Sequence, residues 1–152
     1  MPNLQKCVSV SGGWAYFTNR YLILRERVDL EDQVIPIATL DPDRAVPICH
    51  YVGEHYKSVV SEYKPIWLYA PTIRLTGEGI YKKAQAARKA DRWTCQYAGS
   101  DFNPTFLTDI FRRIPRAEVQ LFSPNSEEMP RQVEGPSLFQ WEGGEALIQP
   151  IV

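Results

Sequence analysis

The side chains that could bind a ligand are mostly basic, and they are unevenly distributed. Residues 81–92 (YKKAQAARKADR) carry five basic side chains and one acid. Residues 112–116 (RRIPR) carry three more basic side chains, whereas residues 26–32 (ERVDLED) are acidic. The net charge of the whole chain is −1, so it is not a polycation. Nucleic-acid binding would therefore require these basic residues to gather on one surface.

Metal and thiol chemistry have weak support in the sequence. The cysteines are Cys7, Cys49 and Cys95, which are widely spaced and form no CxxC motif. An odd number of widely spaced cysteines is typical of buried thiols in a reducing compartment. Cys49, His50 and His55 could contribute to a zinc site, but they lie in one short window without a second ligand pair. We therefore predict no metal and no cofactor.

Catalytic motifs are absent from the sequence. It contains no GxxxxGK[ST], GxGxxG or GxSxG pattern. The two histidines are five residues apart and do not share a helix face, and the carboxylates are scattered. The composition is that of an ordinary globular protein, without a bilayer-spanning apolar stretch or a signal peptide. These features predict a non-catalytic, cytoplasmic protein without a membrane partner.

The first half of the chain predicts short strands followed by one helix. The predicted β-segments are a hairpin at 6–17 with its turn at Ser11-Gly12-Gly13, a strand at 20–28, and an edge strand at 33–38 that contains Pro36. The Asp41-Pro42 pair is typical of a helix start, and apolar residues at spacings of three and four predict a helix near 42–60. We expect Pro65 to stop it.

The second half predicts one clear helix among hairpins. Alternating patterns predict strands at 65–76 (two strands around Ala70-Pro71), 92–98, 117–123, 137–142 and 145–151, the last two joined at Gly143-Gly144. Asp101 or Asn103 can cap a helix at 104–114, which begins with Pro104 and ends before Pro115. Residues 81–91 favour a helix by composition, although an exposed β-ribbon or a loop stays open. Residues 124–136 are expected to form a loop.

This order of elements predicts an α+β fold with mostly antiparallel sheet, because the strands are linked as hairpins and the helices are few. A unit of strand, helix and hairpin occurs around 33–76 and again around 92–150. The length suits a single domain, 1–152, with an additional N-terminal hairpin at about 1–30. The expected core or cleft residues are Phe106, Leu107, Ile110, Val119, Leu121, Leu138 and Leu147.

Three segments of the C-terminal half form a recognisable pattern: DFNPTFLTDIFRRI at 101–114, the strand AEVQLF after it, and the closing hairpin LFQWEGGEALIQPIV. This pattern resembles bacterial β-type DNA sliding clamps, the β subunits of DNA polymerase III. Upstream, PIWLYAPTIRLTGEG and residues 89–101 resemble the preceding clamp strands. The likeness covers about 65–152 and includes Phe102-Asn103, Asp109 and Pro150. It implies a DNA-clamp-like fold with two helices packed on antiparallel sheets.

In that family the helices face DNA phosphates, so the resemblance implies a non-specific contact with duplex DNA through basic side chains. The implied residues are Arg112, Arg113 and Arg116, with Lys82, Lys83, Arg88 and Lys89 as helpers. The alternative is that these side chains are ordinary solvated surface.

The family also binds partner peptides in an apolar cleft near the C-terminus. The matching positions here are Asn103, Phe106, Leu147, Gln149 and Pro150. A groove of this kind combines apolar walls with a few polar anchors. The alternative is that Phe106 and Leu147 are plain core residues.

Three functions follow from these expectations. The first is a clamp-like DNA-associated protein, a processivity or tethering factor that forms a homo-oligomer. A ring would need several copies of such a short chain. The second is a non-catalytic protein-binding module or inhibitor with a clamp-like fold, encoded by a virus or mobile element, that targets a nucleic-acid machine. The third, ranked last, is a small enzyme of unrecognised type.

Overall fold

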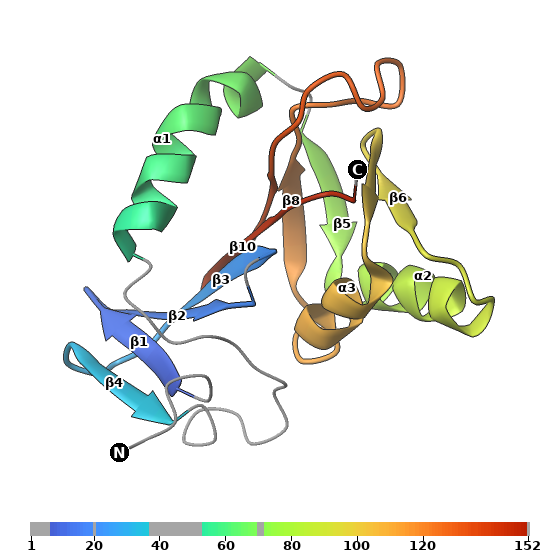
Figure 1. Ribbon diagram of the computed structural model, residues 1–152. Coiled ribbons are helices and arrows are strands. Elements are labelled where there is room, and N and C mark those ends of the chain that lie inside the picture. Colours follow the sequence, from blue (N-terminus) through green and yellow to red (C-terminus); the bar gives the residue numbers. More distant parts are fainter. Residues whose placement is uncertain (1–6, 20, 37–52, 70–71, 152) are drawn as a thin grey trace. The chain divides into compact units, whose positions relative to one another are not determined.

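A computed structural model describes residues 7–19, 21–36, 53–69 and 72–151 (Figure 1). These residues form ten β-strands and three α-helices. The strand pairs with an assigned register are all antiparallel, so the predicted α+β, antiparallel architecture is confirmed. The chain packs as two compact units, Met1–Glu62 with Gly143–Leu147, and Tyr63–Glu142 with Ile148–Val152. The expectation of a single domain stays a prediction.

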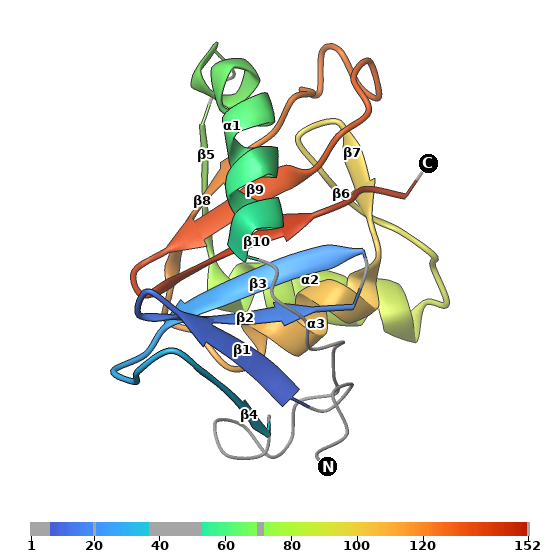
Figure 2. The ribbon, with the colours of Figure 1, turned by 60° about the vertical axis from the view of Figure 1, so that its left-hand side comes forward.

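The first unit is built on an antiparallel sheet in the order β4-β1-β2-β3, with β10 beside β3 (Figure 2). Its strands are β1 Cys7–Ser11, β2 Trp14–Thr18, β3 Leu22–Arg27, β4 Gln33–Pro36 and β10 Gly144–Ile148. The turn between β1 and β2 places Gly12 and Gly13 at φ 59° and 82°, which glycine adopts without steric cost. The predicted hairpin at 6–17, strand at 20–28 and edge strand at 33–38 are therefore confirmed within the described residues.

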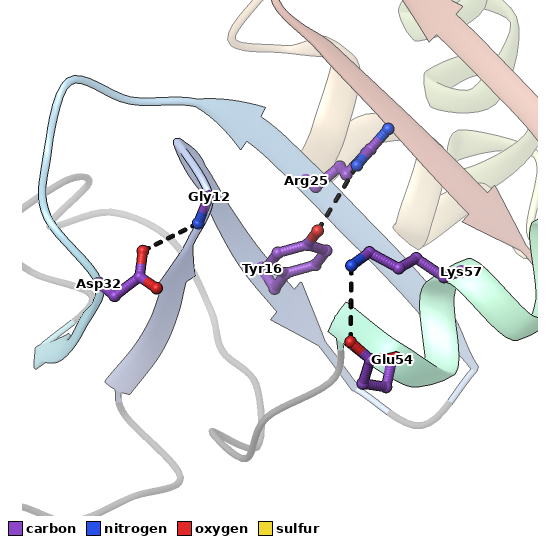
Figure 3. Close-up of polar contacts among 6 residues, drawn as sticks. All are labelled: Gly12, Tyr16, Arg25, Asp32, Glu54 and Lys57. Carbon is purple, nitrogen blue, oxygen red and sulfur yellow. Dashed lines mark hydrogen bonds and ion pairs between the residues drawn. The ribbon is translucent and has the colours of Figure 1, made fainter.

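Burial in this unit follows the strand register. Ser11 pairs with Trp14 and Val8 with Ile35 across the antiparallel ladders. Val8, Ala15 and Leu24 are almost fully buried, whereas β4, at the end of the strand order, is mostly exposed. The amide of Gly12 donates to Asp32 Oδ1 at 2.9 Å, so the segment before β4 holds the β1–β2 turn (Figure 3).

Arg25 on β3 organises the aromatic side chains of this unit. Its guanidinium lies 3.8 Å from the ring centroid of Trp14 and 4.2 Å from that of Tyr56. It donates to the Tyr16 hydroxyl at 3.5 Å (Figure 3) and forms an ion pair with Glu145 at 3.4 Å. Cation–π contacts of this kind strengthen as the cation loses water. The cluster therefore ties β2 and β3 to β10 and to the first turns of the helix that follows β4.

Helix α1, Gly53–Tyr69, differs from its prediction. Residues 42–52 of the predicted helix lie outside the described residues. The helix does not stop at Pro65 but contains it, and it covers 65–69, where the sequence predicted a strand. Burial explains this result, because Trp67 is 3% exposed and donates its indole N–H to Pro136 O at 3.3 Å. Tyr63 stacks on Trp67 with ring centroids 6.1 Å apart, one helical turn away.

The second unit contains a three-stranded antiparallel arrangement, β9-β8-β5, and a separate hairpin, β6-β7. The strands are β5 Ile73–Thr76, β6 Cys95–Tyr97, β7 Ser100–Phe102, β8 Glu118–Phe122 and β9 Ser137–Trp141. The predicted strands at 92–98, 117–123 and 137–142 are confirmed, as is the second of the two predicted at 65–76. Strand β7 was not predicted, because it has only three residues and lies directly before the helix cap at Asn103.

Two helices complete this unit, α2 Gly77–Lys89 and α3 Pro104–Phe111. The sequence left residues 81–91 open between a helix, a β-ribbon and a loop. In the structure, residues 81–89 are helical and belong to α2. Helix α3 begins as predicted, since Asn103 Oδ1 accepts from Thr105 N at 2.9 Å. It ends at Phe111, three residues earlier than predicted. The described chain therefore holds three helices where the sequence predicted two principal ones.

Aromatic rings form the core of the second unit. The ring of Phe139 lies 5.3 Å from that of Phe102 and 5.8 Å from that of Phe111, and Phe111 meets Trp141 at 5.5 Å.

Of the residues predicted for core or cleft, Phe106 is half-buried and the others are buried, namely Leu107, Ile110, Val119, Leu121, Leu138 and Leu147.

Candidate nucleic-acid interface

Helices α2 and α3 pack directly against each other (Figure 1). The buried stripe of α2 comprises Ile80, Ala84 and Ala87, which recur at spacings of four and three. Two alanines in that stripe leave room for α3 to approach closely. Most of the remaining α2 side chains are exposed. We refer to the exposed side chains of these two helices together as the outer face of the pair.

Exposed side chains on this outer face include four of the predicted cations. Lys82 and Lys89 are seven residues apart on α2 and so lie on the same stripe of the helix. Arg88 is exposed near the end of α2, and Arg112 caps the C-terminus of α3. Such a spread of cations suits a phosphate backbone better than a single small anion.

Two lysines of α2 already have partners within the chain. Lys82 forms an ion pair with Glu78 at 2.8 Å, and that contact lowers the pKa of the Glu78 carboxyl. Lys83 donates to Gln96 O and lies 4.0 Å from the centroid of the Tyr97 ring. Burial raises the pKa of the Tyr97 hydroxyl, so it stays neutral beside this lysine. Lys83 is thus directed toward β6.

A carboxylate lies between the cations of the two helices. Arg88 Nη1 donates to Thr108 Oγ1 at 3.0 Å, which links α2 to α3. Asp109 is next in sequence and interacts with Arg112 and Arg88. Loss of hydration raises the pKa of the Asp109 carboxyl, although the two guanidinium groups act in the opposite direction. The charge of Asp109 partly cancels the positive potential of this face.

The turn after α3 directs the other predicted arginines to a different place. Gly77 N donates to Ala117 O at 2.9 Å and Glu78 N to Pro115 O at 2.9 Å, so the start of α2 holds residues 113–117. Arg113 and Arg116 border an open depression of about 1280 Å³ with Arg74 of β5. Glu118 and Glu142 also border it. Arg74 was not predicted as part of a site, because it is distant from residues 113–116 along the chain.

The seven predicted DNA-binding residues therefore fall into three groups. The outer face of the helix pair carries Lys82, Arg88, Lys89 and Arg112. The depression beside β5 and β8 carries Arg113 and Arg116. Lys83 contacts β6.

The C-terminal segment lines a small pocket. Gln149, Pro150 and Ile151 border a cavity of about 160 Å³ whose other wall includes Arg131 and residues 133–135. Ile151 N donates to Asp101 O at 2.7 Å, which fixes the segment beside β7. Asp101 in turn forms an ion pair with Arg131 at 2.7 Å. The pocket thus combines apolar side chains with two paired charges.

Asn125 holds the opposite wall of this pocket. Its Nδ2 donates to Ser100 Oγ at 3.2 Å and to Val133 O at 2.9 Å, and its Oδ1 accepts from Val133 N at 2.8 Å. The side chain is 7% exposed, so these bonds replace water. The sequence predicted only a loop here. A buried asparagine in a loop leaves no periodic signal that would have identified it.

The remaining residues predicted for the partner cleft lie elsewhere. Asn103 uses its side-chain oxygen to cap α3. Phe106 is half-buried on that helix. Leu147 is 3% exposed in β10 and is counted in the first unit. Only Gln149 and Pro150 of the five border the small pocket.

Among the described residues, no group of three metal-ligating side chains occurs, and no helix is both long and apolar enough to cross a bilayer. Cys49 and His50 lie outside the described residues, and His55 is exposed on α1. Cys7 and Cys95 are buried free thiols, and burial raises the pKa of Cys95.

One solved structure is similar to this chain over nearly its whole length. It is a crystal structure from Eubacterium rectale described as "Putative DNA polymerase III beta subunit". The similarity has a TM-score of 0.53, with 14% sequence identity over 95% of this chain. The fold is clamp-like.

The clamp-like similarity extends further than the resemblance read from residues 65–152, because it includes most of the first unit. It covers 56% of the solved protein, so this chain spans little more than half of that protein's length. No family model matches the sequence, and the comparison with curated proteins found no match. At this level of identity, the similarity shows the fold alone.

Proposed function

We propose that this protein is a clamp-like DNA-associated factor, used for processivity or tethering, that contacts duplex DNA without sequence preference. The observation that carries the proposal is the clamp-like fold over 95% of the chain. The outer face of α2 and α3 supports it, since Lys82, Arg88, Lys89 and Arg112 are exposed there. The pocket lined by Gln149 and Pro150 is the proposed site for a partner peptide. Assembly as a homo-oligomer belongs to the same proposal.

The DNA contact is tested by fluorescence anisotropy with a labelled duplex across a salt series. If the outer face binds phosphates, the double variant Lys89→Ala/Arg112→Ala lowers the slope of log affinity against log salt by about 2, because two counterion-releasing contacts are lost. The loss should be equal for duplexes of unrelated sequence. A wild-type protein that fails to bind duplex DNA even at low salt would overturn the proposal.

A matched control separates a local contact from net charge. Lys57→Ala/Lys64→Ala removes the same charge from exposed positions of α1. We expect this pair to change the slope far less than the pair on α2 and α3. The double variant Arg113→Ala/Arg116→Ala then reports whether the depression beside β5 also meets DNA. Equal losses for all three pairs would indicate a diffuse charge effect and not an interface.

The alternative is a protein-binding module or inhibitor with a clamp-like fold. It is favoured by the partners that the cations already have, since Lys82 pairs with Glu78, Lys83 contacts β6, and Asp109 lies beside Arg88 and Arg112. The net charge of −1 points in the same direction. This function requires no DNA contact. It predicts an unchanged anisotropy with every duplex, together with peptide binding that Pro150→Ala weakens.

A further inference from the structure

Trp93 is the most exposed large hydrophobic residue in the described chain, with 86% of its surface accessible. The other tryptophans behave differently: Trp67 and Trp141 are buried, and Trp14 lies under Arg25 and Arg27. Exposing an indole to water is unfavourable, so a tryptophan left in solvent is informative. Packing of the core does not explain this residue.

Hydrogen bonds hold the backbone directly before Trp93. Arg92 N donates to Ala87 O at 2.8 Å and Asp91 N donates to Arg88 O at 3.1 Å. Asp91 has φ 56°, the left-handed conformation that closes a helix with this pair of bonds. Strand β6 begins at Cys95, only two residues later. The indole is therefore presented from a short link between a capped helix and a strand, at low conformational cost.

Two exposed cations lie close to Trp93 in the sequence. Lys89 ends α2 four residues before Trp93, and Arg92 directly precedes it. In the part of the chain that is described, neither side chain makes a hydrogen bond or an ion pair. Asp91 contributes one opposing charge. The local balance is thus two available cations against one carboxylate around an exposed aromatic face.

A neighbouring pocket of about 440 Å³ contains further charges, but they are largely satisfied. It is bordered by Arg92, Lys83 and Arg131. Lys83 already contacts Gln96, and Arg131 is paired with Asp101. Glu127 also borders the pocket. We therefore attribute ligand contact to Lys89 and Arg92 alone.

We propose that Trp93, Lys89 and Arg92 form a stacking platform for an unpaired base of single-stranded DNA, with the two cations on the adjoining phosphates. An indole offers a flat surface to any base, and cations beside it match the charge of the backbone. A base-paired duplex keeps its bases stacked internally, so it cannot use this site. The inference rests on the proposed DNA association and names a second DNA form, bound at a site that shares Lys89 with the outer face of α2 and α3 but depends on Trp93 and Arg92.

The test compares labelled single-stranded DNA with a duplex of the same sequence by anisotropy. Trp93→Ala should weaken single-strand binding about tenfold and leave duplex binding unchanged, while Trp93→Phe retains most of the affinity. Asp91→Asn should strengthen single-strand binding, because it removes the opposing charge and tolerates the left-handed backbone. The unfolding midpoint of each variant serves as the folding control.

The outcomes separate this inference from the proposed function. Equal single-strand affinity of wild type and Trp93→Ala overturns the platform, even when duplex binding depends on Lys89 and Arg112. Single-strand binding that requires Trp93, without any duplex binding, supports the platform and removes the duplex proposal. A blue shift of tryptophan emission with anionic lipid vesicles but not with single-stranded DNA would overturn the platform in favour of a membrane contact.

Discussion

Arg88 Nη1 donates to Thr108 Oγ1 at 3.0 Å, and this bond joins the two helices of the candidate interface. Thr108 is 3% exposed and its hydroxyl donates to Thr105 O at 3.0 Å. Thr108→Val keeps the shape of the side chain but removes the hydroxyl that accepts this bond. We therefore expect the free energy of unfolding, measured in urea, to fall by about 0.5–1.5 kcal/mol. Thr105→Val changes an exposed side chain and should have little effect. Equal losses in both variants would contradict the role of the bond.

Gly77 has no room for a side chain. A Cβ at this position would lie 2.0 Å from Ile114 O, so the turn that carries Arg113 and Arg116 would have to move. We expect Gly77→Ala to destabilise the protein by about 1–3 kcal/mol, the usual range for overpacking. Gly79→Ala is the control in the same helical turn, where a Cβ meets only Thr76 Oγ1 at 3.0 Å. A stabilised Gly77→Ala variant would show that the turn adapts freely.

Arg25 should be important for the stability of the first unit. Arg25→Met keeps the apolar stem but removes the ion pair with Glu145 and the contacts over Trp14 and Tyr56. Because the substitution leaves polar groups without their partner, we expect the free energy of unfolding, measured with a chemical denaturant, to fall by about 1–3 kcal/mol. Arg27→Met is the matched control, since Arg27 is exposed and contacts only the Trp14 ring among these groups. A larger loss for Arg27→Met would contradict this assignment.

Asn125 should be the residue that shapes the pocket beside the C-terminal segment. Asn125→Ala removes its bonds to Ser100 and Val133, which should cost about 1–3 kcal/mol because the site is buried. The loop at 126–134 should then be cut faster in limited proteolysis. Gln132→Ala in the same loop removes only an exposed bond to Pro130 O and provides the control. Unchanged cleavage in the Asn125 variant would show that the loop is held by other contacts.

Asp109 should make stability depend on pH. Its pKa is raised above the usual 3.8 by loss of hydration, so the folded protein binds this proton more tightly than the unfolded chain. Stability from this group is therefore present below the unfolded pKa and is lost as pH rises through the folded pKa. We expect Asp109→Asn to raise the thermal midpoint at pH 7, with no difference at about pH 3. A lower midpoint at pH 7 would mean that Arg88 and Arg112 outweigh hydration. Asp91→Asn, which removes an exposed carboxylate outside the helices, is the control.

Local signals in the sequence were sufficient wherever a conformation is decided by a few neighbouring residues. The glycine pair after Ser11 allowed the first hairpin to be predicted, because its turn needs positive φ. Asn103 and Pro104 identified the start of α3, since capping and a fixed proline φ act within one turn. Strict alternation over 117–123 identified β8. The resemblance at 101–114 led to the clamp-like fold for the same reason, because it lies in one continuous stretch.

Tertiary packing decided the features that depend on residues distant in sequence. Pro65 is tolerated inside α1 because Trp67 is buried and bonded to Pro136, which outweighs the local preference to end the helix. The sequence identified the basic residues, but it did not show that they divide between the helix pair, the depression beside β5 and β8, and strand β6. Gly77 lies close to Ile114 in the turn after α3, where Arg113 and Arg116 border the same depression as Arg74, whereas Arg112 interacts with Asp109. A sequence reports charge by position along the chain, and only the fold places those charges on surfaces.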